Sequence, residues 1–234
     1  MVIVFEGKIG AGKSSVASRL AEKLGTELFR ELVDNNELLE NYYADPERYG
    51  FQLQISFLNQ RFKDIKEAYK SNNNILDRSI LADQLFTLTN AQRGSFSWWE
   101  YELYCGLLNN MMEEIDSRLP YKKSPDLLIY LDADLDHTLK NIKKRGRVYE
   151  QIEDENGSII DAEQLGYYKL LSDNYDVWIG KREPLNEGEK SIDVYNSSPV
   201  LIIDAEKYDV VNSEDDWNEV YNIIENKLKE LGLI

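Results

Sequence analysis

Cysteine and histidine are nearly missing from this sequence, which contains only Cys105 and His137 of these two types. A single cysteine excludes an internal disulfide and a cysteine-cluster metal site, and a single histidine excludes a zinc site built from histidines. Cys105 falls in a helical pattern, where we expect a buried thiol. His137 lies near an expected helix start, where we expect a solvated surface residue.

The sequence also lacks long apolar runs and an excess of positive charge. No run approaches the roughly 20 apolar residues that span a bilayer, and no basic stretch with an apolar core precedes the first expected strand. The 43 acidic and 27 basic residues give a net charge of −16. This charge repels polyanions, so we expect no binding to nucleic acids or to membranes. A cytoplasmic location is the resulting expectation.

Glycine, in contrast, is concentrated near the start of the chain. Residues 7–14 read GKIGAGKS, after an apolar run at 2–5 and before an amphipathic segment. The spacing matches G-x-x-x-x-G-K-[ST], a loop whose backbone N–H groups surround phosphate oxygens at a helix start. We expect Lys13 to lie between the β- and γ-phosphates, and Ser14 to bind Mg²⁺. The expected nucleotide-binding residues of this loop are Gly7, Gly10, Ala11, Gly12, Lys13, Ser14 and Ser15.

Strand-like and helix-like patterns alternate along the rest of the chain. Strands are expected at 2–5, 28–29, 75–79, 127–132 and 200–204, and helical patterns lie between and after them. Residues 90–96 and 180–198 read as loops. Since there are no internal repeats, we expect one α/β domain over 1–234, with a five-stranded parallel sheet and helices on both faces.

Charged residues follow several of the expected strands. Glu31 follows the second strand, Asp77 and Arg78 end the third, and Asp132 ends the fourth. Ligands bind at the carboxyl edge of open parallel sheets, so these side chains are placed for chemistry. The pattern alone favours Asp132 over Asp77 as a metal-side aspartate, because Asp132 follows the longer apolar run.

Three further patterns have two interpretations each. The basic cluster at 143–147 is either a solvated helix end or a lid over the γ-phosphate. Gln54 and Arg61 share one helix face, and periodicity alone favours ordinary exposed residues. The apolar stripe of the helix that starts after Ser97 is a core face by default, or else a dimer contact; it consists of Trp99, Leu103, Leu107, Met111 and Ile115.

Taken together, these residues resemble the deoxyribonucleoside kinases, in particular the bacterial deoxyadenosine/deoxyguanosine kinases and the related deoxycytidine kinases. The similarity covers almost the whole chain. It is carried by residues 7–14, by Glu31-Leu32-Val33, by Tyr43, by PERYGFQLQ at 46–54, by Asp77-Arg78-Ser79 and by RGRVYEQ at 145–151.

The resemblance implies a P-loop kinase fold with a lid at about 141–151. It implies ATP- and Mg²⁺-dependent 5′-phosphorylation of a deoxynucleoside in nucleotide salvage, by a homodimer. The expected substrate is a purine deoxynucleoside, first of all deoxyadenosine, or deoxycytidine. The Arg61/Asp83 pair is similar to the arrangement in relatives that take these nucleosides and not thymidine.

Residue roles follow from the same resemblance. Glu31 matches the carboxylate that accepts the 5′-hydroxyl proton, Arg78 the arginine that holds it, and Asp77, not Asp132, the metal-side acid. Lys13 and Arg145 complete the expected catalytic set. The remaining expected contacts are Tyr43 and Glu150 to the sugar, Gln54, Arg61 and Asp83 to the base, Arg145 and Arg147 to the phosphates, and Tyr208 to the adenine of ATP.

The sequence departs from the family pattern in three places. Leu32 replaces a proline, Asn141 stands where many relatives have another lid arginine, and the stretch 153–160 is longer than expected. Two rival functions stay open. A thymidylate-type nucleoside monophosphate kinase shares the glycine loop and Arg30-Glu31, but it needs extra cations for its acceptor phosphate. A noncatalytic nucleotide-binding switch would not need Glu31, Asp77 and the lid arginines together.

Overall fold

The computed structural model describes residues 1–31, 36–71, 73–118, 125–154, 156–181 and 198–234. The strands are β1 (Val2–Gly7), β2 (Glu27–Phe29), β3 (Asn74–Asp77), β4 (Leu127–Asp132) and β5 (Val200–Asp204). The helices are α1 (Lys13–Leu24), α2 (Glu37–Ala44), α3 (Pro46–Ser71), α4 (Ala82–Gln92), α5 (Trp98–Arg118), α6 (Leu135–Arg145), α7 (Ala162–Trp178) and α8 (Glu214–Glu230), with a short 3₁₀ helix η1 (Val148–Glu150). Residues 182–197 of the expected loop 180–198 lie outside the described residues, as does the Leu32-Val33 pair.

The five strands form one parallel sheet in the order β2-β3-β1-β4-β5. In the register of the sheet, Phe5 of β1 lies beside Asp77 of β3 and Ile129 of β4. The carboxyl ends of β1, β3 and β4 therefore meet at one edge. The predicted α/β fold with a five-stranded parallel sheet is confirmed.

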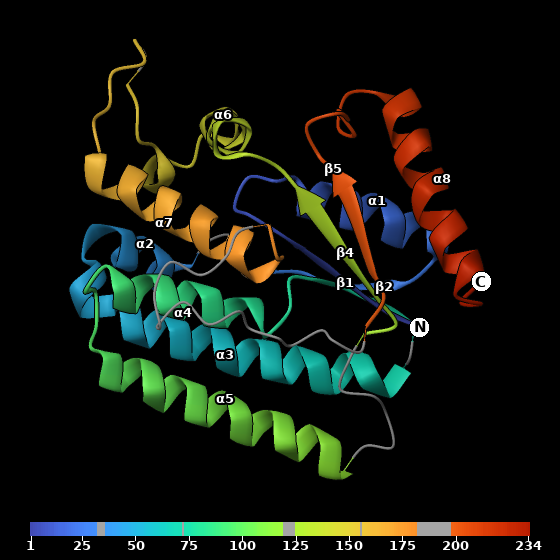
Figure 1. The fold of residues 1–234 in the computed structure, drawn as a ribbon, viewed down its shortest axis with the longest axis horizontal. Helices are drawn as coiled ribbons and strands as arrows, with labels where there is room; N and C mark the ends of the chain where they lie inside the picture. The colour runs from blue at the N-terminus through green and yellow to red at the C-terminus, as the bar shows by residue number, and fades with distance from the viewer. Residues whose placement is uncertain (32–35, 72, 119–124, 155, 182–197) are drawn as a thin grey trace.

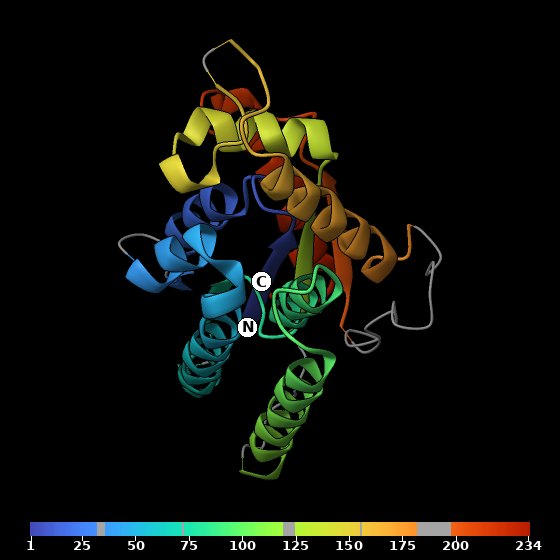
Figure 2. The same cartoon turned by 90° about the vertical axis from the view of Figure 1, so that its left-hand side faces the viewer.

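Helices cover both faces of this sheet (Figure 1 and Figure 2). Ile3 and Phe5 of β1 belong to the apolar cluster that includes residues of α1 and α8. Val2 and Val4 point to the opposite face and pack with residues of α3 and α5. This alternation is what a strand buried on both faces requires, and it explains the nearly continuous apolar run at 2–5.

Helix ends follow the capping chemistry of the sequence. Gly25 ends α1 with a φ of 63°, a conformation that glycine adopts without strain. Ser97 and Glu100 form a reciprocal capping box before α5, with Ser97 N donating to Glu100 at 2.7 Å. Asp161 and Ser213 accept from backbone N–H groups at the starts of α7 and α8. The start of α5 after Ser97 is as predicted, whereas α4 continues to Gln92, into the stretch expected as a loop.

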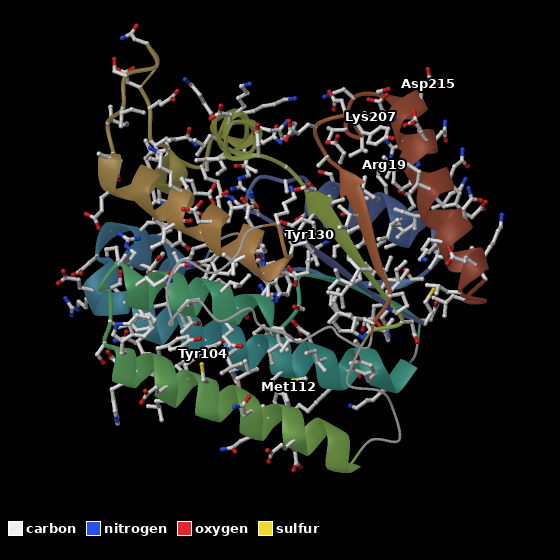
Figure 3. The ribbon with its side chains drawn as sticks, viewed as in Figure 1. Arg19, Tyr104, Met112, Tyr130, Lys207 and Asp215 are labelled. Atoms are coloured by element: carbon white, nitrogen blue, oxygen red, sulfur yellow. The ribbon has the colours of Figure 1, made fainter. Side chains whose placement is uncertain are left out.

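The apolar stripe of α5 is a core face over only part of its length. Trp99 is 68% exposed and Leu103 49% exposed, while Tyr104 and Leu108 on another face of the helix are buried. Figure 3 places Tyr104 and Met112 on the side of α5 that faces α3, and α5 lies at the lower edge of the view in Figure 1. The prediction of a core face is confirmed for Leu107 and Met111, which pack against the buried cluster, and is wrong for the exposed start of the stripe, because α5 carries large apolar residues on more than one side. None of the helices in the described ranges is long and apolar enough to cross a membrane.

Candidate active site

A cavity of about 580 Å³ opens at the carboxyl edge of the sheet. It is lined by the glycine loop, by α2, α3 and α4, by the region after α6 and by the loop after β5. Most predicted site residues line it: Gly10, Ala11, Gly12, Lys13, Ser14, Ser15, Glu31, Tyr43, Gln54, Arg78, Asp83, Arg145, Arg147, Glu150 and Tyr208. Gly7, Arg61 and Asp77 lie behind this lining. Segments far apart in the sequence thus converge on one cavity.

The glycine loop has the backbone of a phosphate-binding loop. Gly10 and Gly12 have φ values of 83° and 88°, which place consecutive N–H groups around the start of α1. The Lys13 ammonium is buried and donates to the carbonyl of Lys8 at 2.9 Å. Burial, together with the charge of Arg78, lowers the pKa of Lys13 to about 7. A phosphate group would supply the negative charge that this buried lysine needs.

Glu31 is held by two arginines from different elements. Its Oε1 accepts from Arg61 Nη2 at 2.6 Å and from Arg78 Nε at 3.1 Å. Burial opposes ionisation of this carboxyl, but the charges of Arg78 and Arg61 outweigh it and lower the pKa of Glu31 to about 2. Its side chain remains 20% exposed. Glu31 is therefore an ionised carboxylate that still faces the cavity.

Arg78 itself occupies a strained backbone position. Its φ is 87°, and it is the one non-glycine residue with a positive φ in the described part of the chain. Such conformations cost of order 1–3 kcal/mol and persist where the surroundings fix them. Ser79 N donates to Glu6 Oε1 at 2.8 Å, and the Arg78 guanidinium contacts the hydroxyl of Tyr175. These contacts hold the turn that directs Arg78 Nε toward Glu31.

Glu6 and Tyr175 were missed by the sequence analysis. Glu6 is fully buried, and burial raises its pKa. The signal was a lone acid at the end of the apolar run of β1, directly before Gly7. Tyr175 gives no such signal, because it lies in an ordinary apolar helical stripe of α7.

A second polar group lies between α3 and α4. Arg61 Nε donates to Asp83 Oδ2 at 2.5 Å, and Thr87 donates its hydroxyl to Gln54 Oε1 at 3.3 Å. Burial raises the pKa of Asp83 to about 6. Gln54 and Arg61 are only 3% and 7% exposed, so the interpretation of ordinary surface residues was wrong. Periodicity could not reveal this, because a second layer of helices covers that face of α3.

The second half of α6 and the segment after it line the cavity on the side opposite α3 and α4. Arg145 Nη2 donates to Glu150 Oε2 at 2.6 Å, and Arg147 Nη1 lies 3.4 Å from Glu150 Oε1. Asn141 donates to the carbonyl of Gly10 at 2.8 Å, which ties α6 to the glycine loop. Asn141, which stands where the family pattern has a lid arginine, therefore forms a structural contact with the glycine loop.

The loop after β5 forms the far end of the cavity. Tyr208 lines it and donates its hydroxyl to Glu219 Oε1 at 2.9 Å. Glu206 accepts from the backbone N–H of Asp134 at 2.7 Å and so joins this loop to the start of α6. His137, from the first turn of α6, also lines the cavity and is half-buried. The histidine expected at the solvated surface is thus half-buried in the wall of the cavity.

The two aspartates considered for a metal differ in their surroundings. Asp77 is buried, and its Oδ1 has no hydrogen-bond partner among the described residues. Asp132 forms an ion pair with Lys181. Among those same residues no group of three or more His, Cys, Asp or Glu side chains could hold a metal by itself. Any metal here would need ligands from a bound substrate or from water.

Comparison with known proteins identifies the family of this chain. Residues 3–229 match the family described as deoxynucleoside kinase. The chain belongs to the deoxynucleoside kinase family. As a member of this family, it is a phosphotransferase that acts on deoxynucleosides. The predicted resemblance is confirmed.

Individual deoxynucleoside kinases are similar over nearly the full length. A deoxyguanosine kinase of Lactobacillus acidophilus is 45% identical over 231 residues, which cover 99% of this chain and 92% of that protein. A deoxyadenosine kinase of the same organism is 42% identical, with 99% and 98% covered. The structure of a deoxyadenosine kinase from M. mycoides with bound dATP superposes with a TM-score of 0.74 at 30% identity and covers 96% of this chain and 100% of that one.

Proposed function

We propose that this deoxynucleoside kinase transfers the γ-phosphoryl group of ATP to the 5′-hydroxyl of a purine deoxynucleoside or deoxycytidine, in nucleotide salvage. One observation carries the proposal. Glu31, a carboxylate held by Arg78 and Arg61, faces the same cavity as Lys13 and the glycine loop. A proton acceptor for a hydroxyl and a phosphate-binding loop are thus parts of one site.

The proposed reaction assigns Glu31 the role of proton acceptor. The 5′-oxygen forms a bond to the γ-phosphorus, the bond from that phosphorus to the β,γ-bridging oxygen breaks, and ADP leaves. The 5′-hydroxyl proton passes to the Glu31 carboxylate. Arg78 orients this carboxylate and the 5′-oxygen, while Lys13 and the loop N–H groups stabilise the charge on the transferred group.

Sugar and base would occupy the α2–α4 side of the cavity. Tyr43 and Glu150 both line it and are the proposed contacts of the 3′-hydroxyl. Gln54, with Arg61 and Asp83, offers donors and acceptors for the base edge. Relatives that are deoxyguanosine and deoxyadenosine kinases, at 45% and 42% identity, support a purine as the first choice.

The donor side would hold ATP between α6 and the loop after β5. Arg145 and Arg147 are the proposed lid arginines of the segment 141–151, and they would exchange Glu150 for phosphate oxygens when ATP binds. Tyr208 would pack on the adenine. That the M. mycoides relative binds dATP supports a nucleotide in this cavity.

Mg²⁺ fits the residues on this side. The Ser14 hydroxyl lines the cavity, and Asp77 supplies a buried carboxylate oxygen that lacks a hydrogen-bond partner within the described residues. Hydroxyl and carboxylate oxygens, completed by phosphates and water, are the ligands that Mg²⁺ prefers. When bound, Mg²⁺ would neutralise charge on the phosphates. The ion pair of Asp132 with Lys181 supports Asp77 over Asp132 in this role.

The single domain over 1–234, the homodimer and the cytoplasmic location stay predictions of the sequence analysis. Limited proteolysis, light scattering and cell fractionation would test them in turn.

Phosphate transfer from labelled ATP tests the proposed function. The purified protein is incubated with Mg²⁺ and each of the four deoxynucleosides, or with dTMP. We expect transfer to a purine deoxynucleoside or deoxycytidine, and a loss of about 10²- to 10⁴-fold in kcat for Glu31→Gln. The matched control is Glu27→Gln, which changes an exposed glutamate of β2.

Other results would favour the rivals. Transfer to dTMP alone would identify a nucleoside monophosphate kinase. ATP binding without any transfer would identify a noncatalytic nucleotide-binding protein.

A further inference from the structure

Arg61 lies between Asp83, which belongs to the proposed base-binding group, and Glu31, the proposed proton acceptor. Arg61 Nε donates to Asp83 Oδ2 at 2.5 Å, and Nη2 of the same guanidinium donates to Glu31 Oε1 at 2.6 Å. The Arg61 and Asp83 side chains are both buried. The guanidinium is rigid and planar, so a shift toward one partner moves it relative to the other.

Glu31 presents the same oxygen to both of its arginines. Oε1 accepts from Arg61 and from Arg78, at 2.6 and 3.1 Å. Two charged donors on one oxygen stabilise the carboxylate and reduce its affinity for a further proton. In this arrangement Glu31 is well oriented but a weak proton acceptor.

The Arg61 guanidinium has two further contacts besides the two carboxylates. Nη1 lies 3.4 Å from the carbonyl of Arg78, and the guanidinium lies over the ring of Phe57, 6.0 Å from its centroid. Phe57, Gln54 and Asp83 line the cavity. A planar base placed against these three residues is therefore next to the Arg61–Asp83 pair.

We propose that Arg61 is a positioning residue that couples occupation of the base subsite to the readiness of Glu31. A base whose edge bonds to the Arg61–Asp83 pair draws the guanidinium away from Glu31. Oε1 then keeps Arg78 as its donor and is free to accept the 5′-hydroxyl proton as the phosphoryl group is transferred. The base thus contributes to kcat as well as to binding. This inference rests on the proposed function of the site.

The test separates the base from the sugar. The substrate 1,2-dideoxyribose carries the 5′-hydroxyl without a base, and the free base of the best nucleoside substrate is added to it. With the wild-type protein, ATP and saturating sugar, we expect kcat to be at least about tenfold below that on the nucleoside, since truncated substrates lose kcat when remote contacts act in the transition state. Added free base should restore much of this loss.

The matched variants separate coupling from binding. Arg61→Met/Asp83→Asn removes both charges together, so that no buried charge is left unpaired. In this double variant, free base should no longer raise kcat on the sugar. In Gln54→Ala, which keeps Arg61, free base should still raise kcat but at a higher base concentration.

Two results would overturn the coupling. The first is a wild-type kcat on saturating sugar that does not respond to base, because the base would then contribute to binding alone. The second is activation of the double variant to the wild-type extent. Absence of transfer to every deoxynucleoside would instead overturn the proposed function, and the inference with it.

A spectroscopic measurement covers the case in which turnover of the sugar is too slow to follow. The ¹⁵N–¹H signals of arginine side chains are recorded with saturating free base, and the Arg61 signal is identified by its loss in the double variant. We expect this signal to move on addition of base. An unchanged Arg61 signal at saturation would overturn the proposal.

Discussion

At the scale of single residues, Glu31 links the site to the stability of the fold. Arg78 and Arg61 outweigh the effect of burial and lower its pKa to about 2, from about 4.5 in an unfolded chain. A folded-state pKa below the unfolded one stabilises the protein above pH 4.5, and this contribution is lost as the pH falls toward 2. Glu31→Gln should therefore lower the free energy of unfolding by about 3 kcal/mol at pH 7, with a smaller difference in acid. Urea unfolding at pH 7, 4 and 3 measures this difference, and a constant value across pH would contradict the explanation.

Arg145 is the second residue with a separable role. It lies 2.6 Å from Glu150 and lines the cavity beside the glycine loop. If it stabilises the transferred phosphoryl group, Arg145→Ala should reduce kcat about 10³-fold, by analogy with arginine fingers. The KM of the nucleoside should change little. Steady-state kinetics checks both, with Lys143→Ala as the control, because Lys143 on the same helix pairs with Glu153 at an exposed site. Equal effects of the two substitutions would remove Arg145 from the mechanism.

At the scale of elements, α6 packs closely on the glycine loop at Gly10. A Cβ on Gly10 would lie 2.5 Å from the carbonyl oxygen of Thr138 in α6, and Gly10 also has a φ of 83°. Gly10→Ala should therefore push α6 off the loop and raise the Kd of ATP at least tenfold, since a 1.4 kcal/mol loss is already tenfold.

Gly94 provides a matched control for that substitution. Its φ is 82°, but nothing lies within 4 Å of an added Cβ. Gly94→Ala should lower stability by about 1 kcal/mol through backbone strain and leave ATP affinity unchanged. Calorimetric titration with ATP and thermal unfolding distinguish the two variants. Equal ATP affinities would show that the contact with α6 is unimportant.

The positions of several helices and strands could be predicted from the sequence, whereas the orientation of one helix could not. Strands, helix starts and the glycine loop depend on neighbouring residues, so β4 and the start of α5 after Ser97 could be predicted. The orientation of α5 could not be predicted, because its exposed and buried sides are both apolar.

In the site, the glycine loop, Glu31 and Arg78 meet at the cavity because each follows a strand of one parallel sheet. The predicted base and sugar contacts instead reach the cavity from helices. The bridge that Arg61 makes between Asp83 and Glu31 could not be predicted from the chain. It spans separations of 22 and 30 residues and depends on how α3 packs against the sheet. The importance of Glu6 could have been inferred from the sequence, since an acid inside an apolar strand requires a partner.

At the scale of the whole molecule, we propose α5 as the contact surface of the predicted homodimer. Trp98, Trp99 and Leu103 are 49%, 68% and 49% exposed at its outer side. Neighbouring exposed side chains of this size mark protein interfaces. Trp99→Glu/Leu103→Glu should convert a dimer to a monomer, which light scattering coupled to gel filtration would detect. Lys140→Glu, an exposed change on α6, should leave the dimer intact. A double variant that remains dimeric would place the interface elsewhere.

The half-buried histidine in the cavity has a practical consequence. Since His137 is the only histidine in the chain, its two carbon-bound ring protons give the only imidazole C–H signals in a proton NMR spectrum. They lie on the wall between α6 and the loop after β5. Titrating ATP into unlabelled protein and following these two lines would therefore report filling of the donor side directly, without isotope enrichment or an attached dye.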